Sequence, residues 1–170
     1  MSIDAIISPE TREDIAAISR VIREAFAGMP YAEGDEAGLV DSLRREGALT
    51  VSLVAEVGGR VVGQVAFSPA VAADGSEGWF ALGPLAVLPG HQRRGIGTKL
   101  VRSGLRAITA LGAAGCILVG DPKYYVRFGF APSPSHAPAG MPREYFMIRM
   151  LGSREPRGPI SFHEAFGGRP

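Results

Sequence analysis

Hydrophobic residues near the start of the chain recur with the period of an α-helix. Thr11 and Asp14 have the spacing of a helix-capping pair, and apolar residues follow at three- and four-residue steps as far as Phe26. Gly28 and Pro30 then end the pattern, so a helix is predicted between these signals. A short strand over residues 3–7 and a second, shorter helix at residues 39–43 are predicted on either side of it.

Strand-like patterns follow in the middle of the chain. Two β-rich runs at residues 49–56 and 60–70 flank Gly58 and Gly59, a pair that supplies the positive φ angles of a tight hairpin turn. These two strands are therefore predicted to be antiparallel neighbours. After a turn at residues 73–76, a third long strand is predicted over residues 79–88.

A helix and a buried strand come next. Five apolar residues share one helical face that Gly112 ends, namely Leu100, Val101, Leu105, Ile108 and Leu111. Residues 116–119 are wholly apolar, as in a buried strand, and a strand–helix–strand unit usually joins parallel strands. A brief helix at residues 124–128 and a last strand at residues 145–151 complete a mixed α/β (α+β) pattern, antiparallel first and parallel later.

The composition is that of one globular domain. With 170 residues, of which 46% are hydrophobic and 21% charged, the chain is long enough to bury its own core. We expect one domain over residues 1–151 and a C-terminal tail over residues 152–170 that packs on the same domain. A net charge of +1 argues against a nucleic-acid partner.

The single cysteine and the N-terminus indicate the compartment. Cys116 cannot form an intramolecular disulfide, and its apolar neighbours favour a buried thiol over a nucleophile. The N-terminus lacks the basic start and apolar core of a signal peptide, and no apolar run approaches the ~20 residues of a membrane helix. The expectation is a cytoplasmic protein without a membrane partner.

Residues 92–98 carry the candidate chemistry. Gly95 and Gly97 let a ligand approach the backbone, the helix predicted to start there offers free N–H groups, and Arg93 and Arg94 add two cations. This combination predicts a site for an anion such as a pyrophosphate. A P-loop is excluded because no Lys-Ser or Lys-Thr pair follows Gly95, and a dinucleotide-binding motif is excluded because Leu100 replaces its third glycine.

The pattern Gln-x-x-Gly-x-Gly after a predicted strand closely resembles the GCN5-related N-acetyltransferase (GNAT) family. The stretch from Tyr125 to Phe130 resembles the second family hallmark, a tyrosine four residues before Gly-Phe. Residues 120–122 and 163–166 further resemble the YhbS-like branch, so the likeness covers essentially the whole chain. The resemblance implies one N-acetyltransferase domain with a twisted, mostly antiparallel sheet, a splayed parallel pair and flanking helices.

The resemblance also implies an activity and its residues. It implies transfer of the acetyl group of acetyl-CoA to a primary amine of a small molecule or peptide, by direct attack in a ternary complex and without a metal. Tyr125 is the implied acid that protonates the departing thiolate, and Tyr124 is the less favoured phenol. The implied cofactor-binding residues are Leu85, Ala86 and Val87 for the pantetheine arm, Arg93, Arg94, Gly95, Ile96, Gly97 and Thr98 for the pyrophosphate, and also Gln92, Tyr125 and Phe128.

Several roles stay open at this level. The base that deprotonates the amine is Asp121, Glu24, Glu33, Glu164 or water, and His91 is assigned to the turn or to solvent. Many family members place an asparagine where this chain has Gly-Asp-Pro at residues 120–122. The sequence does not identify the acceptor, leaves a homodimer open, and allows a rival function, a non-catalytic acyl-CoA-binding sensor or interaction module of the same fold.

Overall fold

A mixed β-sheet flanked by helices forms the fold of the computed structural model, which describes residues 4–30, 32 and 34–167. The strands are β1 (Ile6–Pro9), β2 (Val51–Val57), β3 (Arg60–Pro69), β4 (Val71–Ala72), β5 (Trp79–Val87), β6 (Gly115–Val119), β7 (Ala131–Pro132), β8 (Phe146–Met150) and β9 (Ile160–Ser161). The helices are α1 (Ile15–Phe26), α2 (Glu36–Arg45), α3 (Ile96–Ala110) and α4 (Pro122–Tyr125). None of the helices in the described residues has the length and hydrophobicity of a membrane span.

The order of the strands confirms the predicted fold class. Seven strands follow one another as β1-β2-β3-β5-β6-β8-β7, and β4 pairs with β9 separately. The sheet is mostly antiparallel, and β5 and β6 form its parallel pair. Two compact units divide the chain, the first made of Met1–Phe67 and Gly83–Arg106 and the second of Ser68–Leu82 and Ala107–Pro170. The expected division at residue 151 stays a prediction.

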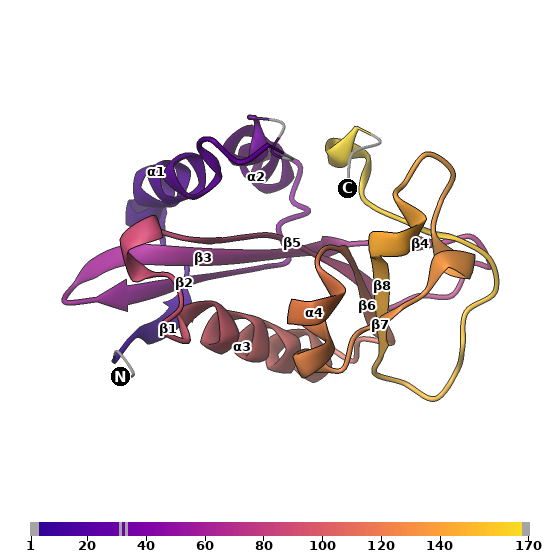
Figure 1. Ribbon diagram of the computed structural model, residues 1–170. Coiled ribbons are helices and arrows are strands. Elements are labelled where there is room, and N and C mark those ends of the chain that lie inside the picture. Colours follow the sequence, from indigo (N-terminus) through magenta and orange to yellow (C-terminus); the bar gives the residue numbers. More distant parts are fainter. Residues whose placement is uncertain (1–3, 31, 33, 168–170) are drawn as a thin grey trace. The chain divides into compact units, whose positions relative to one another are not determined.

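Helices cover both faces of the strands in the first unit. Figure 1 shows α1 and α2 on one side of β2 and β3, and α3 on the opposite side. The close approach of α3 to β3 depends on glycine, because a Cβ at Gly104 would lie 2.1 Å from Cε1 of Phe67. Phe67 is fully buried, and burial of such a side chain contributes about 1.5–3 kcal/mol. This packing holds α3, which follows the glycine-rich loop at residues 88–95.

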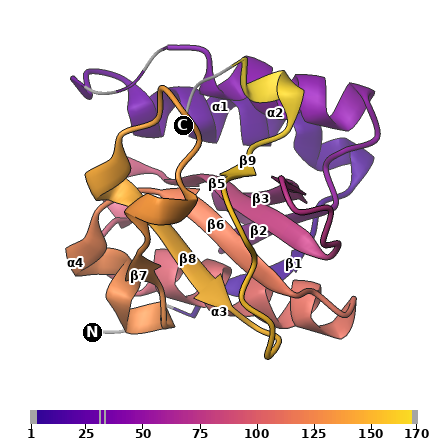
Figure 2. The same cartoon turned by 90° about the vertical axis from the view of Figure 1, so that its right-hand side faces the viewer.

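In the second unit, β6 pairs with strands on both of its sides. It runs parallel to β5 from the pair Trp79–Gly115 to the pair Ala81–Ile117. It runs antiparallel to β8, which lies between β6 and β7 in Figure 2. A Cβ at Gly115 would lie 2.3 Å from Cζ3 of Trp79, so the pairing also requires glycine at this position. The end of β6 leads directly into α4.

Two predicted positions are wrong at the ends of elements. The first strand occupies Ile6–Pro9 rather than residues 3–7, because it pairs with β2 over those four residues. Residue 3 lies outside the described residues. Leu111 is not part of the buried face of α3: the helix ends at Ala110 and Leu111 is 60% exposed. Gly112 turns the chain there with a φ of 86°.

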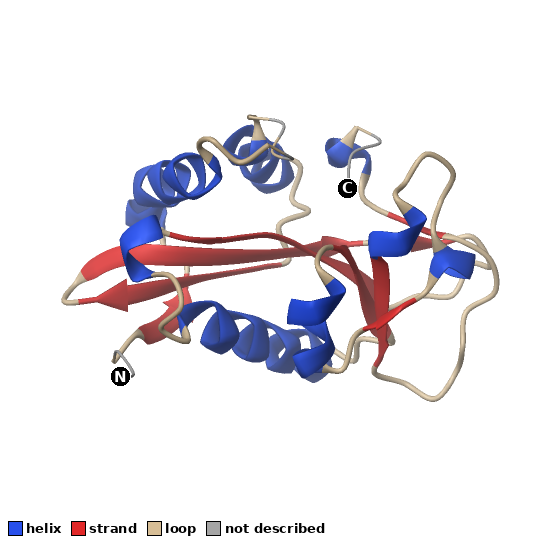
Figure 3. Ribbon diagram, in the orientation of Figure 1, coloured by secondary structure: helices blue, strands red, loops and turns tan. Residues whose placement is uncertain are grey.

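The C-terminal segment contains structure that its sequence pattern does not predict. β9 pairs with β4, and a 3-10 turn at Glu164–Phe166 follows, drawn as a helix near the C-terminus in Figure 3. Phe162 and Phe166 are buried, with ring centroids 5.1 Å apart. The prediction that the strand at residues 145–151 is the last one is therefore wrong, because β9 follows β8. A two-residue strand such as β9 is too short to show an alternating pattern.

Candidate active site

The glycine-rich loop joins β5 to α3 in the first unit. Arg93 has a φ of 63° and Gly95 a φ of 83°, so the chain uses two left-handed residues to turn into the helix. The side-chain amide of Gln92 donates to the carbonyl oxygen of Val87 at 2.9 Å, which ties the loop to the end of β5. The N–H of Lys99 then donates to the Gly95 oxygen at 3.1 Å, as one of the first hydrogen bonds of α3.

The start of α3 has the features of an anion site. The N–H groups of Ile96, Gly97 and Thr98 lie in the first turn, where helix geometry provides no acceptor within the helix. Arg93 and Arg94 are exposed, and neither has an ion-pair partner in the described part of the chain. The helix dipole favours an anion here by about 0.3–1 kcal/mol, and the guanidinium groups can add charge-assisted hydrogen bonds. A phosphate group fits these donors.

Burial separates the predicted cofactor residues into two groups. Ile96 is 1% exposed, and its Cγ2 lies 3.4 Å from the position that a Cβ would take at Gly63, so its side chain belongs to the core. Ala86 is also buried, whereas Leu85 and Val87 are half-buried. Only the main chain of Ile96 and Ala86 is therefore suited to contact a ligand.

Tyr125, the predicted acid, ends helix α4 in the second unit. Oδ1 of Asp121 accepts from the N–H of Lys123 at 2.9 Å, and the Asp121 carbonyl accepts from the N–H of Tyr125 at 3.1 Å. Asp121 thus caps α4 and fixes the backbone that carries the tyrosine. The Tyr125 side chain is half-buried. A phenol titrates near ~10 and a thiol near ~8.5, so proton transfer from this type of side chain to a thiolate is not far from balanced.

Aromatic rings surround Tyr125. Its ring centroid lies 5.0 Å from that of Tyr124, 6.2 Å from that of Phe128 and 6.1 Å from that of Phe130. Aromatic pairs of this kind contribute about 0.5–1.5 kcal/mol beyond their burial. Phe128, predicted as a cofactor contact, is 3% exposed, so its ring belongs to this cluster rather than to the surface.

Arginine side chains hold the backbone on both sides of this cluster. Nε of Arg127 donates to the Tyr124 oxygen at 2.8 Å, and its Cζ lies 4.5 Å from the centre of the Tyr124 ring. Nη1 of Arg149 donates to the Phe128 oxygen at 2.6 Å. Tyr124 therefore has a structural contact of its own on α4, and its lower rank as a candidate acid stays a prediction.

The candidate bases are dispersed along the chain. The carboxylate of Asp121 serves as the α4 cap, and Glu24 lies 3.8 Å from Arg20 on α1. Glu33 lies outside the described residues. His91 is half-buried, and its buried Nδ1 has no hydrogen-bond partner within residues 4–30, 32 and 34–167.

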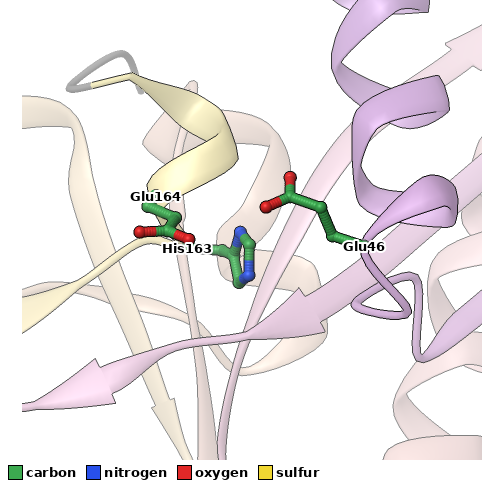
Figure 4. A group of neighbouring side chains, drawn as sticks. All are labelled: Glu46, His163 and Glu164. Carbon is green, nitrogen blue, oxygen red and sulfur yellow. The ribbon is translucent and has the colours of Figure 1, made fainter.

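Glu164, another candidate base, begins the C-terminal 3-10 turn of the second unit and is drawn with His163 in Figure 4. Nδ1 of His163 accepts from the N–H of Ala165 at 3.0 Å, so the imidazole caps this turn. Glu46, also drawn in Figure 4, belongs to the first unit, where its N–H donates to the Ser42 oxygen at 3.0 Å and closes α2. The hydrogen bond to His163 and the one from Glu46 are therefore local contacts that stabilise turns.

A polar network that links α2 to the strands was not predicted. Nε and Nη2 of Arg44 each donate to the Glu10 carboxylate at 2.9 Å, and the hydrogen bond to Glu10 raises the pKa of Arg44. Ser52 Oγ also donates to Glu10, at 2.5 Å, and accepts from the Gln64 amide at 3.0 Å. Arg44, Glu10 and Ser52 border a pocket of about 290 Å³. The sequence signal that could have indicated this network is the presence of two polar residues, Ser52 and Gln64, inside otherwise apolar strands.

Comparison with known proteins places the chain among acetyltransferases. Residues 49–132 match the model of the acetyltransferase (GNAT) domain. The uncharacterized N-acetyltransferase YhbS of Escherichia coli strain K12 is 37% identical over 133 residues, which cover 77% of this chain and 76% of YhbS.

Solved structures of similar proteins share the fold. A GNAT family acetyltransferase from Brucella melitensis, solved in complex with acetyl-CoA, matches with a TM-score of 0.84 and 42% identity over 95% of this chain and 97% of that protein. YhbS from Escherichia coli, solved in complex with CoA, matches with a TM-score of 0.88 and 31% identity over 98% of this chain and 94% of that protein.

Proposed function

The chain belongs to the GNAT family of acetyltransferases, and we propose that it transfers the acetyl group of acetyl-CoA to a primary amine of a small molecule or peptide. The turn that ends at α3 carries the proposal, because the left-handed residues Arg93 and Gly95, two exposed cations and a helix N-terminus coincide there. The relatives solved with acetyl-CoA and with CoA support the same ligand for this chain.

In this proposal the glycine-rich loop binds the pyrophosphate of coenzyme A. The N–H groups of Ile96, Gly97 and Thr98 donate to its oxygens, and Arg93 and Arg94 supply two positive charges. The pantetheine arm carries amide groups that pair with main-chain groups of strand β5 at residues 85–87, in the manner of an added strand. Specificity for the coenzyme therefore rests largely on the backbone.

The transfer itself is proposed to be direct. The amine nitrogen attacks the thioester carbon in a ternary complex, the C–N bond forms, and the C–S bond breaks as coenzyme A departs as a thiolate. The phenol of Tyr125 gives its proton to that thiolate, and the proton released by the amine passes to water or to a carboxylate. Tyr125 is regenerated from solvent.

A covalent route through the protein has little support. Cys116 is the one cysteine of the sequence, and it is fully buried within β6. Burial raises the pKa of its thiol, so the reactive thiolate is disfavoured. Its apolar position supports a core role for this side chain and direct transfer for the reaction.

Release of free thiol from acetyl-CoA tests the proposal. The purified protein is offered acetyl-CoA with a panel of amines, polyamines and peptides, and at least one amine is expected to accelerate thiol release above hydrolysis. Gly97→Val places a bulky side chain at the proposed pyrophosphate site and is expected to abolish coenzyme A binding by calorimetry. Gly152→Val serves as the control, because Gly152 is exposed and lies in the second unit.

The role of Tyr125 is tested separately. Tyr125→Phe keeps the ring and removes the hydroxyl, so kcat is expected to fall by roughly 10²- to 10⁴-fold while acetyl-CoA affinity changes little. If the original protein and the Tyr125→Phe variant have equal kcat values while the chemical step is rate-limiting, the acid role of Tyr125 is excluded. Tight coenzyme binding without thiol release for any amine would instead favour the non-catalytic sensor.

A further inference from the structure

Gly120, the residue directly after β6, touches the ring of Tyr125. A Cβ built at Gly120 would lie 2.5 Å from Cε2 and 3.0 Å from Cδ2 of Tyr125. Carbon atoms in contact normally stay about 3.5–4.0 Å apart. The tyrosine ring therefore occupies the space that the side chain of any other residue at position 120 would need.

The backbone at position 120 does not itself require glycine. Gly129, in the same segment, has a φ of 86°, whereas Gly120 is not among the residues with positive φ. The N–H of Gly120 donates to the Tyr145 oxygen at 3.0 Å, which continues the hydrogen bonding of β6 with the β8 side. Alanine can adopt this backbone. Neighbouring side chains are thus the reason for a glycine here: the ring of Tyr125 makes the tightest contacts, and Cδ1 of Leu118 would lie 3.2 Å from the same Cβ position.

Other aromatic rings lie close to the same ring. Phe128 and Phe130 are buried, with ring centroids 6.2 Å and 6.1 Å from that of Tyr125. The backbone of Tyr125 is fixed by its hydrogen bond to the Asp121 carbonyl at 3.1 Å. A side chain added at position 120 would therefore push against a half-buried ring whose backbone is fixed and whose neighbours Phe128 and Phe130 are buried.

We propose that Gly120 is a positioning residue that sets the place of the Tyr125 hydroxyl. The inference rests on the proposed function, in which that hydroxyl protonates the thiolate. The contact atom Cε2 is bonded to Cζ, which carries the hydroxyl, so a displacement of the whole ring moves the hydroxyl with it. A rotation of the ring about its Cβ–Cγ bond would leave the hydroxyl in place, and the neighbouring rings of Phe128 and Phe130 oppose such a rotation. Relief of the 2.5 Å contact requires a shift of about 1 Å, and misplacement by about 1 Å can cost a reacting group 10²-fold in rate.

The experiment is a cycle of Gly120→Ala and Tyr125→Phe, measured as thiol release from acetyl-CoA with water as the acceptor. Gly120→Ala is expected to lower kcat by roughly 10- to 100-fold and to leave the KM for acetyl-CoA within about twofold. In the Tyr125→Phe protein the same alanine is expected to have no further effect on kcat. Gly152→Ala is the matched control, because the nearest atom to its Cβ would be 3.7 Å away.

Each outcome decides between the proposals. A fall in kcat with Tyr125→Phe but not with Gly120→Ala overturns the positioning role and leaves the proposed acid intact. No fall with Tyr125→Phe overturns the acid role, and the positioning role with it. An equal loss from Gly120→Ala in both backgrounds shows that the alanine acts through the fold, and it also overturns the proposal.

A second variant applies if the Gly120→Ala protein does not fold. Phe130→Leu keeps an apolar side chain and removes another ring that contacts Tyr125. It is expected to lower kcat by roughly 10-fold in the Tyr125 protein and to change nothing further in the Tyr125→Phe protein. Equal effects in both backgrounds would overturn positioning of the hydroxyl by the surrounding contacts.

Discussion

Replacement of Arg93 by glycine is expected to stabilise the fold while it weakens coenzyme A binding. Arg93 has a φ of 63°, whereas its neighbour Arg94 is not among the residues with positive φ. Both side chains are exposed, and neither has an ion-pair partner among the residues that the structure describes. Arg94→Gly is therefore a matched control with the same loss of charge and a different backbone effect.

The magnitudes follow from the two backbone conformations. A left-handed conformation costs a non-glycine residue roughly 1–2 kcal/mol, and the freedom of glycine in the unfolded chain costs roughly 0.5–1 kcal/mol. Arg93→Gly should therefore raise the free energy of unfolding by up to about 1.5 kcal/mol, whereas Arg94→Gly should lower it by about 0.5–1 kcal/mol. For a chain of 170 residues, each kcal/mol corresponds to roughly 2–4 °C in Tm.

Thermal unfolding and calorimetry with coenzyme A check the two halves of this prediction. Loss of a hydrogen bond to a charged group costs roughly 1.5–3 kcal/mol, so Kd for coenzyme A should rise by roughly 10- to 100-fold in both variants. An equal fall in Tm for the two variants would refute the backbone argument. An unchanged Kd in both would refute the anion site.

Gly104→Ala is expected to destabilise the fold by about 1–3 kcal/mol in chemical unfolding, because its Cβ would lie 2.1 Å from the Phe67 ring. Gly38→Ala, on α2 with open space around it, should instead stabilise by up to about 1 kcal/mol, and equal signs would contradict the packing argument. Hydrogen bonds, chiefly from the Ser76 hydroxyl and also from the N–H groups of Arg157 and Ser76, lower the pKa of Asp74 to about 2. The contribution of the Asp74 carboxylate to stability is therefore complete above the unfolded pKa of ~3.9 and is lost as pH falls toward about 2. Asp74→Asn should remove this part of the pH dependence of unfolding.

Local signals in the sequence predicted the elements that depend on neighbouring residues. Gly58 and Gly59 have φ values of 59° and 79°, as the predicted hairpin turn between β2 and β3 requires. The carboxylate of Asp14 accepts from the N–H of Thr11 at 2.8 Å, in the predicted capping arrangement before α1. Each of these contacts joins residues at most three positions apart, so the sequence contains the whole of the signal.

Contacts between distant residues could not be predicted in the same way. β4 and β9 contain two residues each, and their pairing joins Val71 to Ser161. Such short strands have no period, and only the folded chain brings them together. The bonds from Arg44 and Ser52 to Glu10 likewise join α2, β2 and the residue after β1. The sequence showed polar residues there but not their partners.

Glycine illustrates why one half of the candidate site was predictable and the other was not. Gly95 has a φ of 83°, and no atom beyond its chain neighbours lies within 4 Å of the position that a Cβ would take, so glycine is needed there for the backbone. At Gly120 the reason for glycine is the opposite one. The backbone there has no positive φ and allows alanine, whereas the Tyr125 ring leaves no room for a Cβ. Sequence shows only that a side chain is missing. A spacing motif could identify the first glycine, whereas the second required the position of a ring. Substitutions at the two positions should therefore have different effects. At Gly95 a side chain strains the backbone, which lowers the stability and the affinity for coenzyme A. At Gly120 a side chain displaces the Tyr125 ring, which lowers kcat.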